Sequence, residues 1–153
     1  MMTAPGSAPT FAAIMFLTGV GIPILAALNG GLGGRLGGPM AASMILFGLA
    51  FLIATAGALM TGSVGQIRFS GDIPFHFYFG GLFVAFYVIA VTFIAPKFGV
   101  GNAIFFVLVG QLASAAVIDH FGLFGSMRFP IDAKRIAGIA LMVAGVWLAR
   151  RTA

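Results

Sequence analysis

Five long apolar segments alternate with short polar or glycine-rich connectors along the chain. Each segment is close to the roughly 20 residues that an α-helix needs to cross a hydrocarbon core of about 30 Å, and the fifth is the shortest. None carries a charge in its central part. Because lipid offers no hydrogen-bonding partners, the backbone N–H and C=O groups of such a segment must bond to one another, as they do in a helix. We therefore expect an all-α integral membrane protein, a single transmembrane domain over residues 1–153, with helices at about 9–28, 40–62, 75–95, 100–118 and 133–149.

The first apolar segment differs from a secretory signal peptide. No Lys or Arg precedes it, whereas a signal peptide carries a basic region in this place. We expect a retained helix that bends near Gly19, Gly21 and Pro23, since proline removes one backbone donor. Asn29 and Gly30 at its end are typical of a helix C-terminus, and the alternative for Asn29 is a contact with substrate.

The composition excludes several classes of protein. Only 7% of the residues are charged and 61% are hydrophobic, whereas soluble domains are about 25% charged. There is no Cys, which excludes disulfides and thiol chemistry. The eight basic residues are scattered and form no patch, so we expect no nucleic-acid partner. Two separated histidines and three isolated aspartates predict no metal site, no catalytic group and no cofactor, and we do not expect an enzyme.

Lys and Arg residues are divided equally between the two sides of the predicted bundle. An excess of these residues in short loops marks the cytoplasmic side and sets the orientation of a membrane protein. Because the count is tied, we expect the chain to insert in both orientations and two copies to assemble antiparallel. With five crossings, one side holds Arg68, Arg128, Lys134 and Arg135, and the other holds Arg35, Lys97, Arg150 and Arg151.

The end of the fourth segment carries a family resemblance. Residues 110–125 read GQLASAAVIDHFGLFG, with LNGGLG and GGPMAASMILFG before them and KRIAGIALMVAGVWL after them. These motifs resemble the bacterial YdcZ family of the drug/metabolite transporter superfamily, which also contains the small multidrug resistance proteins. The resemblance covers essentially the whole chain. It implies an inner-membrane protein of about five helices that occurs as an antiparallel homodimer, an oppositely oriented pair or a fused repeat. Where the family tends to have P-W-W, this chain has Pro74, Phe75 and His76.

The polar residues of the apolar segments indicate what kind of molecule is carried. In the small multidrug resistance relatives, a Glu in the first helix binds protons and cationic substrates in turn, but the first segment here has no carboxylate. An ionisable residue inside the membrane marks an ion pathway, so its absence argues against proton-for-cation exchange through this helix. We expect transport of a small neutral, amphipathic or lipid-like molecule through a dimer cavity lined by Asn29, Ser43, Tyr87, Gln111 and Ser114.

Several alternatives stay open at this point. A passive channel or a lipid-organising protein would have the same composition, and a proton-coupled exporter of hydrophobic cations is a further alternative. Ser43 and Ser114 are also small enough to serve close helix packing. Gln111 at mid-helix needs a hydrogen-bonding partner, which is either another helix or a wet cavity. Small residues of the fifth segment predict a dimer contact at Gly138, Ala140, Ala144 and Gly145, in a bundle otherwise surrounded by membrane lipid.

A carboxylate and an imidazole stand together at the end of the fourth segment. Asp119 is one of only three acidic residues, and His120 follows it. The macrodipole disfavours a negative charge at a helix C-terminus, so Asp119 needs a basic partner. We expect an ion pair with Arg135 that holds the DHFGLFG turn, and the alternative is a proton-coupling or gating role. Gln111 and Ser114 lie about 80° and about 140° from Asp119 around the helix, which argues against a single proton wire.

The equal division of basic residues predicts dual topology. A reporter fused to the C-terminus should be found on both sides of the membrane, because no loop bias selects one orientation. Adding about two or three Lys to one connector should then move the reporter to one side. A single orientation of the unmodified chain would contradict an antiparallel homodimer, unless a second protein supplies the inverted half.

Overall fold

The computed structural model describes residues 7–68, 71 and 73–149. Over these residues the chain is helical, as predicted. Three short 3-10 helices lie in the connectors: η1 (Ser63–Gln66), η2 (Phe75–Phe79) and η3 (Leu123–Gly125). The five α-helices are α1 (Ser7–Arg35), α2 (Pro39–Met60), α3 (Gly80–Phe98), α4 (Val100–Phe121) and α5 (Ala133–Ala149).

Four of these helices are long and apolar enough to cross a membrane: α1, α2, α4, and α3 together with η2. The helix α5 forms over the predicted residues but has 17 of them. At 1.5 Å per residue this is about 26 Å, somewhat less than the hydrocarbon core. The described residues therefore contain four membrane-length helices, and the fifth crossing stays a prediction.

Two predicted helix boundaries were wrong. The helix α1 does not end near Asn29 but continues through the glycine-rich stretch to Arg35. Glycine weakens a helix in water, partly by exposing its backbone to solvent. In lipid, a backbone that leaves the helix would find no hydrogen-bonding partners, so the helix is retained. The third segment begins as the 3-10 helix η2 after Pro74, and α3 starts only at Gly80.

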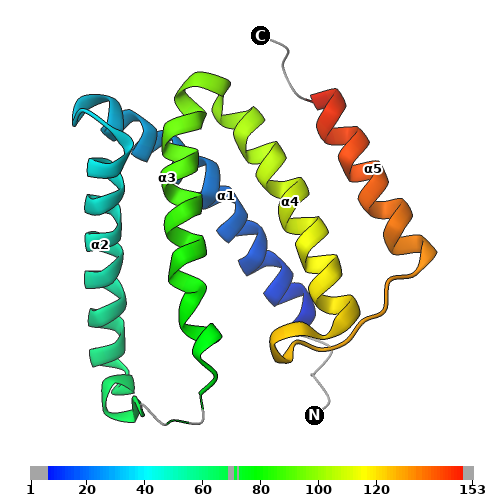
Figure 1. Ribbon diagram of the computed structural model, residues 1–153, viewed down its shortest axis with the longest axis horizontal. Coiled ribbons are helices and arrows are strands. Elements are labelled where there is room, and N and C mark those ends of the chain that lie inside the picture. Colours follow the sequence, from blue (N-terminus) through cyan, green and yellow to red (C-terminus); the bar gives the residue numbers. More distant parts are fainter. Residues whose placement is uncertain (1–6, 69–70, 72, 150–153) are drawn as a thin grey trace.

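The helices alternate in direction, and α5 stands at the edge (Figure 1). The turns α1–α2 and α3–α4 lie at one end of the molecule, and the α2–α3 and α4–α5 connectors lie at the other. The helix α1 passes behind α3 and contacts α2, α3 and α4. The helix α5 packs against α4, and none of its residues is buried. The molecule thus consists of a packed group, α1 to α4, and a less embedded fifth helix.

Small side chains form the interior, and large apolar side chains cover the outside. The core cluster contains Ala26, Val91, Ala95 and Ala103, from α1, α3 and α4. By contrast, Phe83 is 73% exposed, and many other large apolar side chains of the bundle are exposed as well. Lipid tails are as apolar as leucine, so helices in a membrane gain from close backbone approach rather than from burying large side chains. The surface of this bundle is suited to hydrocarbon.

Two glycines of α1 lie close against α3. A methyl group added at Gly30 would lie 3.1 Å from Cγ of Pro96, which is closer than side chains normally pack. One at Gly33 would lie 3.4 Å from the methyl group of Thr92 and 3.4 Å from the carbonyl oxygen of Gly38. These glycines, which were expected at the end of the first segment and in the connector after it, therefore make a helix contact instead.

This contact predicts that leucine substitutions on two faces of α1 will change the free energy of unfolding by different amounts. Gly30→Leu should lower the free energy of unfolding by about 1–3 kcal/mol, because the side chain meets the ring of Pro96. Gly34→Leu is the matched control, since an added methyl group there meets nothing within 4 Å. Unfolding in mixed micelles, followed by circular dichroism, measures both. Equal losses in the two variants would refute the close contact of α1 with α3.

Candidate functional site

A hydrogen bond between α1 and α3 lies inside the bundle. The side chains of Asn29 and Thr92 are both 4% exposed. The Asn29 amide Nδ2 donates to Thr92 Oγ1 at 2.6 Å. Asn29 lies inside α1, well before its end at Arg35, so the interpretation as a helix stop was wrong. Thr92 was not among the residues expected to line a cavity, although a threonine within an apolar segment is itself a signal of a polar contact between helices.

Two further hydroxyl groups are buried, and neither has a hydrogen-bond partner among the described residues. They belong to Ser43 on α2 and Tyr87 on α3. Ser43 is 2% exposed, and the Tyr87 ring packs against the core cluster. A buried polar group without a partner costs about 1–3 kcal/mol. Each such group in a folded protein calls for an explanation, and a bound water, ion or ligand that supplies the missing partner is one.

A groove of about 310 Å³ lies between α3 and α4. Its volume is at the lower end of the range for small-molecule sites. Phe86, at 73% exposed, stands at its border, so the groove opens to the surroundings of the bundle. Tyr87 is the only polar side chain among the residues that line it, which are Phe86, Tyr87, Ala90, Val91, Ile94, Phe98, Ala103, Phe106 and Val107.

Gln111 and Ser114 lie apart from the buried polar residues. Both are on α4 and exposed. The Ser114 hydroxyl donates to the Gln111 carbonyl oxygen, 3.1 Å away on the same helix. Of the five residues expected to line a cavity, the structure therefore places Asn29, Ser43 and Tyr87 inside the bundle and these two outside. Gln111 and Ser114 lie on the outer surface of the chain.

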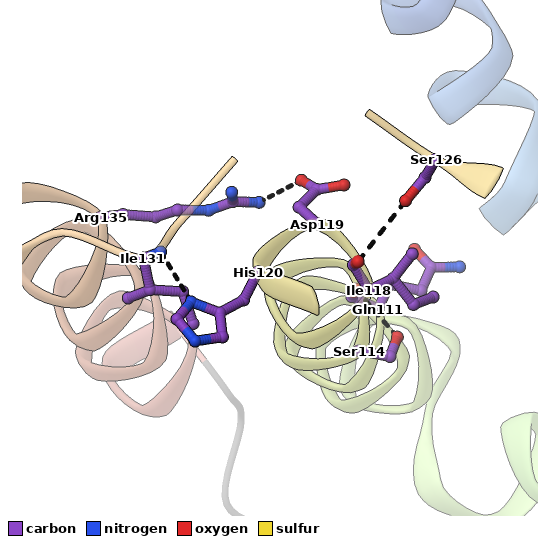
Figure 2. A network of polar contacts seen from close by, with 8 residues as sticks. All are labelled: Gln111, Ser114, Ile118, Asp119, His120, Ser126, Ile131 and Arg135. Carbon is purple, nitrogen blue, oxygen red and sulfur yellow. Dashed lines mark hydrogen bonds and ion pairs between the residues drawn. The ribbon is translucent and has the colours of Figure 1, made fainter. Parts of the chain in front are cut away.

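A polar cluster joins the end of α4 to the start of α5 (Figure 2). Arg135 Nη2 donates to Asp119 Oδ2 at 2.6 Å, and the two side chains are 32% and 33% exposed. The structure thus brings together the two residues that were expected to pair. His120 is beside them, and its Nδ1 accepts a hydrogen bond of 3.0 Å from the backbone N–H of Ile131.

The connector also satisfies the last carbonyl groups of α4. The backbone N–H of Phe129 donates to the carbonyl oxygen of Asp119 at 2.8 Å. Arg128 Nε donates to the carbonyl of His120 at 3.2 Å, and the Ser126 hydroxyl donates to that of Ile118 at 3.4 Å. Carbonyl groups at a helix end have no partner within the helix. The connector therefore serves as the C-terminal cap of α4 and is held in one path by it.

The four small residues of α5 do not form one face. At 100° per residue, Gly138 and Gly145 lie about 20° apart, and Ala140 and Ala144 about 40° apart on a different side of the helix. All four are exposed. A single partner helix could contact one pair but not both. Whether either pair makes a dimer contact stays a prediction.

The comparisons with known proteins support the interpretation of the chain as a membrane protein. A model of the family described as "Putative inner membrane exporter, YdcZ" matches residues 10–148. The match includes all of α2, α3 and α4 and all but the outermost residues of α1 and α5. Exporters are not a class of enzyme. No curated protein and no solved structure matches the chain. Within the described residues, no group of three or more His, Asp or Glu side chains could hold a metal ion.

The ion pair predicts a stabilising role for Asp119. Asp119→Asn should lower the free energy of unfolding by about 0.5–1 kcal/mol, because a partly exposed pair loses its charge. Asp132→Asn is the matched control. The Asp132 carboxylate accepts the backbone N–H of Arg135 at 2.7 Å as a helix cap, and asparagine caps equally well. Normal stability together with a lost pH dependence of transport in Asp119→Asn would instead assign the carboxylate to the mechanism.

Proposed function

The chain belongs to the YdcZ family of inner membrane exporters, and on this premise we propose that it exports a small neutral, amphipathic or lipid-like molecule through a cavity shared by two copies. It is a multi-pass protein of the inner membrane. The single observation that carries the proposal is the pair of buried hydroxyl groups without partners, on Ser43 and Tyr87. A substrate with one or two hydrogen-bonding groups would supply what these hydroxyls lack.

The absence of an acidic residue from the central part of each span supports a neutral substrate. In the sequence, the acidic residues are Asp72, Asp119 and Asp132. The first stands in the α2–α3 connector, the second in the last turn of α4, and the third just before α5. A lipophilic cation inside the bundle would therefore meet neutral hydroxyl and amide groups and no counter-charge. This disfavours the alternative of a proton-coupled exporter of hydrophobic cations.

The groove between α3 and α4 supports entry from the membrane. Its lining is aliphatic and aromatic, with one hydroxyl-bearing residue, Tyr87. An amphipathic molecule dissolved in the bilayer could enter it with its apolar part first. Because the hydroxyl of Tyr87 is buried, a small movement of α3 or α4 is needed before the polar part of the substrate can reach it.

Two considerations support an antiparallel homodimer. First, the alanine-rich interior of one chain leaves little space for a path across the membrane. Second, the equal division of basic residues favours both orientations. In such a dimer the exposed surface of α5 and the exposed polar groups of Gln111 and Ser114 would gain partners. The proposed bundle includes α5 as a fifth crossing, tilted little because it is short.

The proposal predicts that Tyr87→Phe slows transport without lowering stability. In proteoliposomes, export of a neutral amphiphile such as a fluorescent fatty alcohol should saturate. The variant should slow it about tenfold, because one hydrogen bond to the substrate is lost. Its free energy of unfolding should stay equal or rise, because a buried hydroxyl without a partner is removed. Thr18→Val is the control, since the Thr18 hydroxyl is exposed and donates to the carbonyl of Ile14 in its own helix.

The same measurement separates the alternatives. Flux that never saturates would identify a passive channel, and absence of flux with altered lipid mixing would identify a lipid-organising protein. Faster transport of ethidium than of the neutral probe would favour the cation exporter. A Tyr87→Phe variant that transports normally would remove the observation on which the neutral cavity depends.

A further inference from the structure

We propose that His120 is a proton-operated latch, which fixes the start of α5 to the end of α4 when its ring is neutral and releases it when the ring gains a proton. The ring contacts Phe121 edge-on, with the ring centroids 4.6 Å apart. Its Nδ1 accepts the hydrogen bond of the Ile131 backbone N–H. The latch goes beyond the proposed export and can be tested without any substrate.

The identity of the donor determines the protonation state of the ring. A backbone N–H can only donate a hydrogen bond, so Nδ1 of His120 must accept with a lone pair. The ring in this structure is therefore neutral and carries its hydrogen on Nε2. A protonated ring has a hydrogen on both nitrogens. Its Nδ1 is then a donor that faces the N–H donor of Ile131, and no hydrogen bond can form between them. The hydrogen bond from Ile131 holds the connector. It cannot form while His120 is protonated.

The groups that surround His120 are one ion pair, three other charged side chains and a second histidine. On α4 there is Asp119, which is paired with Arg135 of α5. The other charged or titratable groups on the surrounding elements are Arg128 and Asp132 of the connector, Lys134 on α5, and His76 on η2, whose ring lies 6.0 Å from that of Phe124. Aspartate, lysine and arginine keep their charge between about pH 5 and pH 8, the range in which histidine changes its own. The ion pair therefore persists while the His120 bond is lost.

The connector is held in a path that it would not adopt alone. Phe124 has φ 58° and ψ 24°, the left-handed conformation that a residue with a side chain rarely adopts. Gly122 and Gly125 beside it also have positive φ angles, of 65° and 78°. Such strain persists only where surrounding contacts impose it. Removing the bond to Ile131 removes one of these contacts, and the strain then favours separation of the connector from α4.

The position of α5 translates this local change into a movement of a helix. The helix packs on α4 and buries none of its residues, so little packing opposes its displacement. When His120 is protonated, the first turn of α5 stays attached through the pair of Arg135 and Asp119 and can turn about it. A chain without a carboxylate in the central part of its spans would thus respond to protons at one end of the bundle.

A distance measurement between α4 and α5 tests the latch. Because the chain has no Cys, two introduced cysteines carry the only spin labels. Val117→Cys on α4 and Ile136→Cys on α5 are suitable, since these side chains are 48% and 59% exposed. The labelled full chain is placed in lipid nanodiscs with an excess of unlabelled chain, so that distances within one copy dominate. We expect one short distance at about pH 8 and an additional longer one at about pH 5.

Variants at the two histidines show which residue causes the pH-dependent change in the distance between α4 and α5. In His120→Asn the amide oxygen takes the place of Nδ1 as acceptor but does not titrate, so the short distance should hold at both pH values. His76→Asn is the matched control and should respond to pH like the unmodified chain. Hydrogen exchange of the Ile131 amide, corrected for its intrinsic pH dependence, should lose about tenfold of its protection at the lower pH in the unmodified chain and none in His120→Asn.

Three results would overturn the latch. One is a distance and an Ile131 protection that do not change with pH in the unmodified chain. Another is a pH-dependent change that survives in His120→Asn, which would place the titrating group elsewhere. The third is a change that disappears in His76→Asn, which would assign it to the histidine of η2.

Discussion

Two helices in hydrocarbon gain little by burying apolar side chains, so the approach of α1 to α3 depends on what lets their backbones meet. Gly30 and Gly33 remove the side chains from that contact, and the Asn29–Thr92 hydrogen bond adds a polar link at the same level. Because α1 also contacts α2 and α4, this one approach sets the position of the packed group. The groove between α3 and α4 and the two buried hydroxyls all lie on helices that it positions.

The fifth helix is attached by different means. Besides its packing on α4, it is linked through the connector, where backbone and side-chain donors cap α4 and an ion pair reaches α5. Directional bonds at a water-accessible end respond to protons and salt, whereas small-residue packing inside lipid does not. The attachment of the fifth helix therefore depends on pH and salt, whereas the packing of α1 to α4 does not. This would allow the fifth helix to move while the packed group keeps its arrangement.

The sequence was sufficient for the number and the approximate positions of the helices, because length and apolarity alone determine whether a segment can be a membrane helix. It also indicated the partner of Asp119, since Arg135 follows only 16 residues later in the same connector region. The partner of Asn29 could not be predicted in this way. Thr92 is 63 residues away, and their contact depends on the path of α1 past α3. The end of α1 was missed because glycine-rich stretches are turns in water but remain helical where backbone groups must satisfy themselves.

The alternating directions of the helices have a consequence for gene architecture. The helix α1 begins at one end of the bundle and α5 finishes at the other (Figure 1). If a second copy were joined directly behind α5, its first helix would start from the opposite surface, and the whole copy would be upside down relative to the first. An even number of helices would need an additional linker helix for the same result. If α5 crosses the membrane and two copies form the proposed inverted pair, a simple in-frame duplication of this chain would convert that pair into a single polypeptide without any new structural element.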